Sequence, residues 1–219
     1  MDPDEMTNGR LKALEVRLDE DDPDGEEEEE EKQEKLSRES VVVLDLLKKE
    51  RTLIISEMVT PRLTHRIMSQ LLWLDSISEA PIKIYINTPG GSADDGFALY
   101  DLIRFIKAPV FAISVGLNAS AGTLILLGAR KERRLALPNA RIMIHQPSGG
   151  GRGRASDIEI TAEEILKLRQ RANEIIASET GKSVEQVEKD TDRDYWLSAE
   201  QAKSYGLVSR IIRSLRDIQ

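Results

Sequence analysis

The sequence predicts an α/β fold, because strand-like and helical patterns alternate along the chain at short spacing. From Ile82 to Ile86, isoleucines alternate with lysine and tyrosine, which is the two-residue period of a strand. A turn-forming stretch over residues 87–91 ends this strand, and an amphipathic helix is predicted over residues 92–107. A second apolar strand follows over residues 110–115, so a strand, a helix and a strand succeed one another.

The segment before this unit predicts two extended runs and one helix. Val41–Leu44 and Thr52–Ile55 are strand-like runs that flank a charged stretch. Thr60 is placed to cap a helix whose first residue is Pro61. His65 falls off the apolar face of this helix, so we expect it at the surface. The expected apolar face consists of Leu63, Ile67, Leu71 and Leu74.

The second half of the chain repeats the alternation. Gly116–Gly122 turns the strand into an apolar helix over residues 123–127. Further elements are expected in the following order: strands over 134–137 and 141–144, a flexible glycine-rich loop over 148–154, a long helix over 157–179 closed by Thr180-Gly181, two short helices with capping boxes that start at Ser183 and Ser198, the second closed by Gly206, and a last strand over 207–212.

Charge divides the chain at about residue 40. The chain has 219 residues and a net charge of −8, and residues 1–40 alone hold 17 acidic and 6 basic residues. All nine aromatic residues lie beyond residue 70, so the first forty residues lack the apolar surface that would offset their chain entropy. We expect residues 1–40 to be a disordered acidic tail, or an interaction or gating segment, and residues 41–219 to form one domain.

Composition excludes several classes of protein. No apolar run is long enough for a membrane span, and the acidic start does not resemble a secretory signal. The chain has no cysteine and only two histidines, which argues against disulfides, a cysteine nucleophile and a metal centre. The body carries no basic stripe with interleaved aromatics, so nucleic-acid binding has little support. We therefore expect a cytoplasmic protein without a metal.

Two residues at turns are candidates for nucleophilic catalysis. Ser120 stands between alanines on a sharp strand-to-helix turn, where the helix dipole favours developing negative charge. The turn is not a Gly-x-Ser-x-Gly elbow, because Asn118 replaces the first glycine. A serine nucleophile needs a base, and His145, at the end of an apolar strand, is the candidate.

An acyl-transfer site also needs oxyanion donors and an acid that orients the histidine. Gly90 and Gly91 supply two backbone N–H groups with no Cβ to block an approaching substrate. Asp192 and Asp194 lie before two aromatic residues and either could accept the histidine Nδ1–H. Spacing along the sequence does not choose between these two acids.

These segments together resemble the proteolytic subunit family of the Clp protease, ClpP. The resemblance runs in order over about residues 45–215. It is carried by Pro89-Gly90-Gly91, Gly116-Leu117-Asn118-Ala119-Ser120-Ala121-Gly122, Met143-Ile144-His145-Gln146-Pro147, Asp192-Arg193-Asp194-Tyr195-Trp196-Leu197-Ser198-Ala199-Glu200-Gln201-Ala202 and Tyr205-Gly206-Leu207.

The resemblance implies a crotonase-like fold of repeated ββα units with a protruding handle helix. It implies an ATP-dependent Clp-type serine endopeptidase that cuts unfolded polypeptides inside two stacked heptameric rings. A hexameric AAA+ Clp unfoldase would feed the chamber. The chain itself needs no cofactor on this reading, since it has no phosphate-binding Gly-x-x-x-x-Gly-Lys-Ser/Thr loop and ATP falls to the partner.

Carried over position by position, the resemblance assigns Ser120 as nucleophile, His145 as general base and Asp194 as orienting acid. The N–H groups of Gly91 and Ala121 would form the oxyanion hole. Asp192 and Arg193 occupy the place of an acid–arginine pair that links ring assembly to activity in the family.

Three segments depart from the family pattern. The acidic tail replaces the usual axial loop, Lys83 stands where the docking strand often has an aromatic, and the handle loop is rich in glycine and arginine. These departures leave open a weakly active or non-catalytic subunit of a mixed Clp complex. The wider fold adds two further alternatives, an acyl-CoA enzyme and a serine–lysine signal-peptide peptidase. The last expects a catalytic lysine and a membrane anchor, and the sequence indicates neither.

Overall fold

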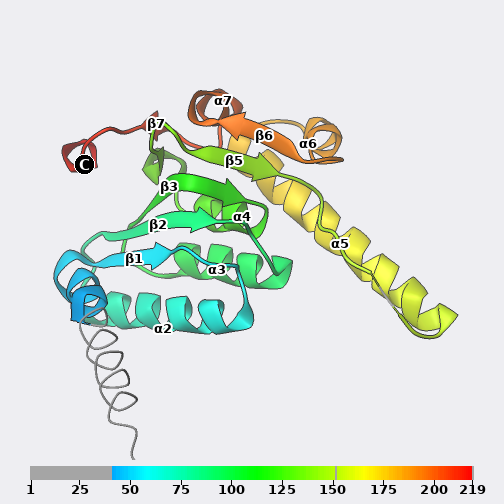
Figure 1. Ribbon diagram of the computed structural model, residues 1–219, viewed down its shortest axis with the longest axis horizontal. Helices are drawn as coiled ribbons and strands as arrows, with labels where there is room; N and C mark the ends of the chain where they lie inside the picture. Colours follow the sequence, from blue (N-terminus) through cyan, green and yellow to red (C-terminus); the bar gives the residue numbers. More distant parts are fainter. Residues whose placement is uncertain (1–40, 151, 219) are drawn as a thin grey trace, which may run out of the picture. The chain divides into compact units, whose positions relative to one another are not determined.

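The computed structural model of the protein describes residues 41–150 and 152–218 (Figure 1). The chain divides into two units, Met1–Val43 and Leu44–Gln219, and every strand among the described residues belongs to the second. The disorder expected for residues 1–40 lies outside the described residues and stays a prediction.

Strands and helices alternate along the second unit, so the predicted α/β class is confirmed. Many of these elements lie within a few residues of their predicted bounds. In chain order they are β1 (Thr52–Ile55), α2 (Pro61–Ile77), β2 (Ile82–Thr88), α3 (Ala93–Phe105), β3 (Val110–Ala119), α4 (Ala121–Gly128), η2 (Lys131–Arg133), β4 (Arg134–Ala136), β5 (Arg141–Ile144), α5 (Ala155–Thr180), α6 (Val184–Asp190), β6 (Tyr195–Ser198), α7 (Ala199–Tyr205), β7 (Arg210–Ile211) and η3 (Leu215–Asp217).

The strands form one mostly parallel sheet in the order β1-β2-β3-β4-β7, with β5 paired to both β3 and β6. Only the pair of β5 with β6 is antiparallel. β3 serves two neighbours in turn: Ala112–Ser114 pair with β4, and Leu117–Ala119 pair with β5. Gly116, at φ +62°, lies between these two stretches. The forking of β3 brings its carboxyl end beside the carboxyl end of β5.

Helices α2 and α3 lie below β1 and β2 in the view of Figure 1, and their apolar residues share the main core with both strands. Thr60 caps α2 as predicted, with its side-chain oxygen accepting the Leu63 N–H, and His65 is exposed. The predicted apolar face is confirmed, because each of its members is at most 1% exposed. These members are Leu63, Ile67, Leu71 and Leu74.

Helix α5 is attached to the rest of the unit mainly through its last three turns. Its 26 residues span roughly 39 Å at 1.5 Å per residue. Its first half projects beyond the sheet (Figure 1), and Ile158, Ile160 and Leu166 are exposed there. The helix ends at Gly181 in the left-handed conformation (φ +78°), as predicted. Its buried residues all fall near that end: Ala172, Asn173, Ile176, Ala177 and Thr180.

Some predicted elements were wrong in type or extent. Residues 41–50 are helical, so the extended run predicted at Val41–Leu44 is wrong. The residues that follow this run include good helix formers, and Asp45 and Lys49 form an ion pair of 2.9 Å four residues apart. Both features favour one helix through the run over an unpaired strand.

Two strand lengths and one cap also differ from prediction. β3 continues to Ala119, although the sequence predicts a turn over its last residues. Pairing with β5 keeps these residues extended. β7 is only two residues long, since it pairs with β4 alone. At Ser198 both halves of the capping box form, whereas at Ser183 only the serine accepts a bond, from the Gln186 N–H.

Deletion of residues 1–40 is expected to leave the melting temperature of the protein within about 2 °C of the full chain. The reason is compositional, since an acidic segment without aromatic residues contributes little buried apolar surface. Comparing thermal unfolding of the two forms by circular dichroism tests this. A drop of roughly 5 °C or more would mean that the segment contributes to the stability of the fold.

Candidate active site

Ser120 occupies the single residue between β3 and α4. Its backbone has φ 56° and ψ −123°, and Arg51 is the only other described non-glycine residue with positive φ. Such a conformation costs about 1–3 kcal/mol and is kept only where the surroundings enforce it. Here the Ser120 N–H donates to the Met143 carbonyl at 2.9 Å. The side chain makes no capping bond to α4, so its hydroxyl is available to another partner.

The register of three strands brings Ser120, His145 and Asp194 together. In the β3–β5 pair Ala119 lies opposite Met143, and in the antiparallel β5–β6 pair Ile144 lies opposite Tyr195. The residues that follow β3, follow β5 and precede β6 therefore meet at one edge of the sheet. Each of the three residues is directly adjacent to the end of a paired strand, which leaves these side chains little freedom to separate.

The three side chains form a hydrogen-bonded chain. His145 Nε2 is 2.8 Å from Ser120 Oγ, and His145 Nδ1 is 2.9 Å from Asp194 Oδ1. Because a carboxylate can only accept, Nδ1 carries the proton and Nε2 is left to accept the serine hydroxyl proton. The His145 side chain is 23% exposed and that of Asp194 is 59% exposed, so substrate and water can reach the site.

Asp194, and not Asp192, contacts the histidine. The Asp192 carboxylate lies 4.0 Å from Arg193 Nε, and both side chains are largely exposed. The Asp192 carbonyl accepts a bond of 2.8 Å from Gln146 Nε2, which ties the loop to the residue after His145. Strand register thus brings the Asp194 carboxylate to the histidine, and Asp192 and Arg193 lie outside the hydrogen-bonded chain.

The glycine pair lies directly against the serine. A Cβ on Gly90 (φ +94°) would stand 2.6 Å from Ser120 Cβ, so only glycine allows this approach. Val59 donates its N–H to the Gly90 carbonyl and accepts from the Ser92 N–H, at 2.8 and 2.9 Å. Residues 90 and 92 thus face Val59, which directs the Gly91 N–H to the opposite side, away from Val59.

Two backbone N–H groups are left as possible oxyanion donors. In the described part of the chain, the N–H groups of Gly91 and Ala121 have no acceptor. Ala121 is the first residue of α4, where an unpaired N–H is expected and the helix dipole adds positive potential. Both residues line the cavity that holds Ser120.

This cavity has a volume of about 300 Å³ and is walled on one side by α5. Sequence reasoning did not identify this wall. Its only sequence signal is the spacing of four, three, four and four residues, which puts five α5 residues on one helix face. The cavity is lined by Gly91, Ser92, Ala93, Asp94, Ser120, Ala121, Thr123, Leu124, Ile144, His145, Pro147, Ser148, Gly149, Gly150, Thr161, Ile165, Leu168, Ala172 and Ile176.

Comparisons with known proteins find matches among Clp proteases. A family model described as Clp protease matches residues 33–215. The chain is 52% identical over 170 residues to "ATP-dependent Clp protease proteolytic subunit 3" of Rhizobium johnstonii, covering 78% of this chain and 88% of that protein. It is 50% identical over 169 residues to the "proteolytic subunit 2" of Treponema denticola, covering 77% and 84%.

This chain belongs to the Clp protease family. Among solved structures, a ClpP1 mutant from Listeria monocytogenes superposes with a TM-score of 0.74 at 45% identity, over 80% of this chain and 99% of that one. The α/β architecture with its largely parallel sheet is therefore the Clp protease, or crotonase-like, fold that the sequence resemblance implied. None of the described helices is long and apolar enough to cross a membrane.

Proposed function

We propose that this member of the Clp protease family is a serine endopeptidase in which Ser120, His145 and Asp194 form the catalytic triad. The single observation that carries the proposal is the hydrogen-bonded chain from Ser120 Oγ through His145 to Asp194 Oδ1. That chain opens on a cavity with a mostly apolar wall and two free N–H groups.

The reaction follows from the roles of these groups. His145 Nε2 takes the proton as Ser120 Oγ bonds to the peptide carbonyl carbon, giving a tetrahedral oxyanion. His145 then gives that proton to the leaving amine, the carbon–nitrogen bond breaks, and an acyl-enzyme remains. Water then attacks the carbonyl carbon of the acyl ester while the same nitrogen takes the water proton, giving a second tetrahedral intermediate. When this intermediate collapses, His145 returns the proton to Ser120 Oγ, and the carboxylic acid product leaves. Asp194 holds the imidazole in the required tautomer and stabilises its charged form.

The oxyanion would be held by the N–H groups of Gly91 and Ala121. Such donors act in a cavity that excludes much of the water and are oriented before the reaction begins. Losing one donor of this kind typically costs about 3 kcal/mol of activation free energy.

The same proposal extends to assembly. We infer that the chain forms two stacked heptameric rings around a chamber, with Asp192 and Arg193 linking assembly to activity. A hexameric Clp ATPase would unfold and deliver polypeptides, because the chain has no phosphate-binding loop of its own. The names of relatives as ATP-dependent proteolytic subunits support this division of labour. Location in the cytoplasm stays a prediction.

Labelling with a fluorophosphonate tests the proposal, because this probe reacts with an activated serine and needs no peptide recognition. The full chain is expected to gain one phosphonyl group, located by peptide mass spectrometry on Ser120. Heat-denatured protein is the control and should not react. An unlabelled native chain would instead indicate the non-catalytic subunit of a mixed complex.

A further inference from the structure

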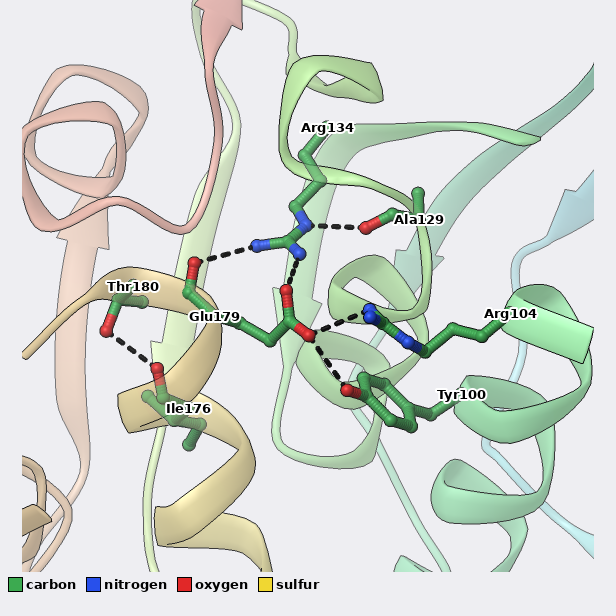
Figure 2. A network of polar contacts seen from close by, with 7 residues as sticks. All are labelled: Tyr100, Arg104, Ala129, Arg134, Ile176, Glu179 and Thr180. Atoms are coloured by element: carbon green, nitrogen blue, oxygen red, sulfur yellow. Dashed lines mark hydrogen bonds and ion pairs between the residues drawn. The ribbon is translucent and has the colours of Figure 1, made fainter. Parts of the chain in front are cut away.

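A buried ion-pair network anchors the carboxyl-terminal end of α5 (Figure 2). Arg134 is fully buried and donates from Nε to the Ala129 carbonyl at 2.8 Å and from Nη1 to the Glu179 carbonyl at 3.2 Å. Its Nη2 donates to the Glu179 carboxylate. Arg104 Nη1 and the Tyr100 hydroxyl donate to the other carboxylate oxygen, at 2.8 and 2.9 Å. One carboxylate thus joins α5 to α3 and to the start of β4.

The electrostatics of this network make the carboxylate hard to replace. Burial lowers the pKa of Arg134, and the charge of Glu179 opposes that effect. Burial and the bond to Glu179 raise the pKa of Tyr100 to about 12, so its hydroxyl remains a donor at neutral pH. Without the carboxylate charge, the Arg134 guanidinium would be a buried cation with no counter-charge, which is a strongly unfavourable arrangement.

Glu179 lies on the same helix face as the wall of the substrate cavity. At 100° per residue, positions four, three, four, four and three residues apart stay within one narrow stripe. The rotation of α5 about its axis therefore determines how this whole stripe faces the cavity. The stripe consists of the cavity-lining residues Thr161, Ile165, Leu168, Ala172 and Ile176, followed by Glu179.

Few other polar contacts resist such a rotation. Among the described residues, α5 is otherwise tied to the unit by the bond of 3.0 Å from Thr191 Oγ1 to Asn173 Oδ1 and by apolar contacts near its end. Arg171 adds a solvent-exposed ion pair with Asp101 at 3.8 Å and lies over the ring of Phe97, and solvent weakens this contact. The first half of the helix is mostly exposed, and in the described residues its part in the cavity lining is limited to Thr161 and Ile165. A rotation of α5 at its anchored end is transmitted along the helix to the residues that line the cavity.

We propose that Glu179 is a positioning residue for the substrate pocket: its carboxylate fixes the rotation of α5 and thereby the apolar wall beside Ser120. This inference rests on the proposed peptidase function. Glu179 acts through the helix and does not touch substrate. The wall it positions is suited to an apolar side chain of the substrate, next to the bond that is cut.

The test compares Glu179→Gln with the unaltered chain on two substrates. One is a fluorogenic peptide with a leucine before the scissile bond, and the other is a small acetyl ester that does not reach the wall. For the peptide we expect KM to rise roughly tenfold while kcat stays within about twofold of the unaltered chain. This pattern is expected when a substitution weakens binding of the substrate and of the transition state equally. Ester turnover and fluorophosphonate labelling should stay unchanged. Glu174→Gln is the matched control, because Glu174 is exposed on the same helix and bonds only Gln170.

An unchanged KM for Glu179→Gln would overturn the role of Glu179. Equal losses on peptide and ester would also overturn it, since they indicate a general loss of folded enzyme. If Glu179→Gln does not fold, Tyr100→Phe carries the test, because it removes one donor and leaves the charges paired. It should raise the peptide KM about threefold, and no rise would count against the inference. A wild type that neither labels nor hydrolyses would overturn the proposed function itself.

Discussion

Ser120→Ala is expected to lower peptide hydrolysis by about 10⁴-fold or more, because no other hydroxyl that lines the cavity is hydrogen-bonded to His145. The substitution removes only an oxygen that caps no helix and bonds only His145. The fold and the assembly should therefore persist. Steady-state hydrolysis of a fluorogenic peptide measures the loss, and native mass spectrometry checks that the assembly is intact.

Another serine that lines the cavity, Ser148, provides the control for this experiment. Ser148 lines the cavity but is exposed and lies outside the hydrogen-bonded chain. Ser148→Ala is expected to keep kcat within about twofold of wild type. Retained turnover in Ser120→Ala, at unchanged native mass, would contradict the assignment of the nucleophile.

Asp194→Asn is expected to lower kcat by roughly 10³-fold. The amide keeps the size of the side chain but removes the charge that stabilises the imidazolium. It also permits the tautomer in which Nε2 carries the proton and cannot act as base. Since Asp194 is 59% exposed, solvent screens its charge, and we expect a smaller loss than for a buried acid. The measurement is kcat at saturating peptide, per assembled subunit.

Asp192→Asn distinguishes the role of Asp192 from that of Asp194. Asp192 does not contact His145, so its variant should keep kcat per assembled subunit near the wild-type value. Its expected effect is on the native mass, through the proposed link to assembly. If Asp192→Asn lowered kcat per assembled subunit as much as Asp194→Asn, the assignment of the acid would be wrong.

Much of the fold was predictable because it depends on local pattern. The period of β2, the apolar stripe of α2 and the cap at Thr60 are each encoded within a few neighbouring residues. Gly181 and Gly206 end their helices in the left-handed conformation for the same local reason.

The features that were missed depend on residues outside the segment that carries the pattern. The Val41–Leu44 run has β-branched residues, yet the helix formers after it decide its conformation. β3 extends through a glycine because β5 pairs with its second half. The choice of Asp194 over Asp192 requires the β5–β6 register, which joins residues some fifty positions apart along the chain.

The candidate site was predictable in its residue types but not in its surroundings. Ser120 and His145 were identifiable from the turns on which they lie. The direction of the Gly91 N–H was not, since it depends on a bridge to Val59. Nor was the α5 wall, because the sequence marks an amphipathic stripe without showing what the stripe faces.

The most direct test of the triad is a crystal structure of the fluorophosphonate adduct of the full chain. The account predicts phosphorus bonded to Ser120 Oγ and one phosphonyl oxygen within hydrogen-bond distance of the Gly91 and Ala121 N–H groups. His145 should remain between Ser120 and Asp194. An adduct on a different residue, or an imidazole of His145 turned away from both partners in the adduct, would contradict it.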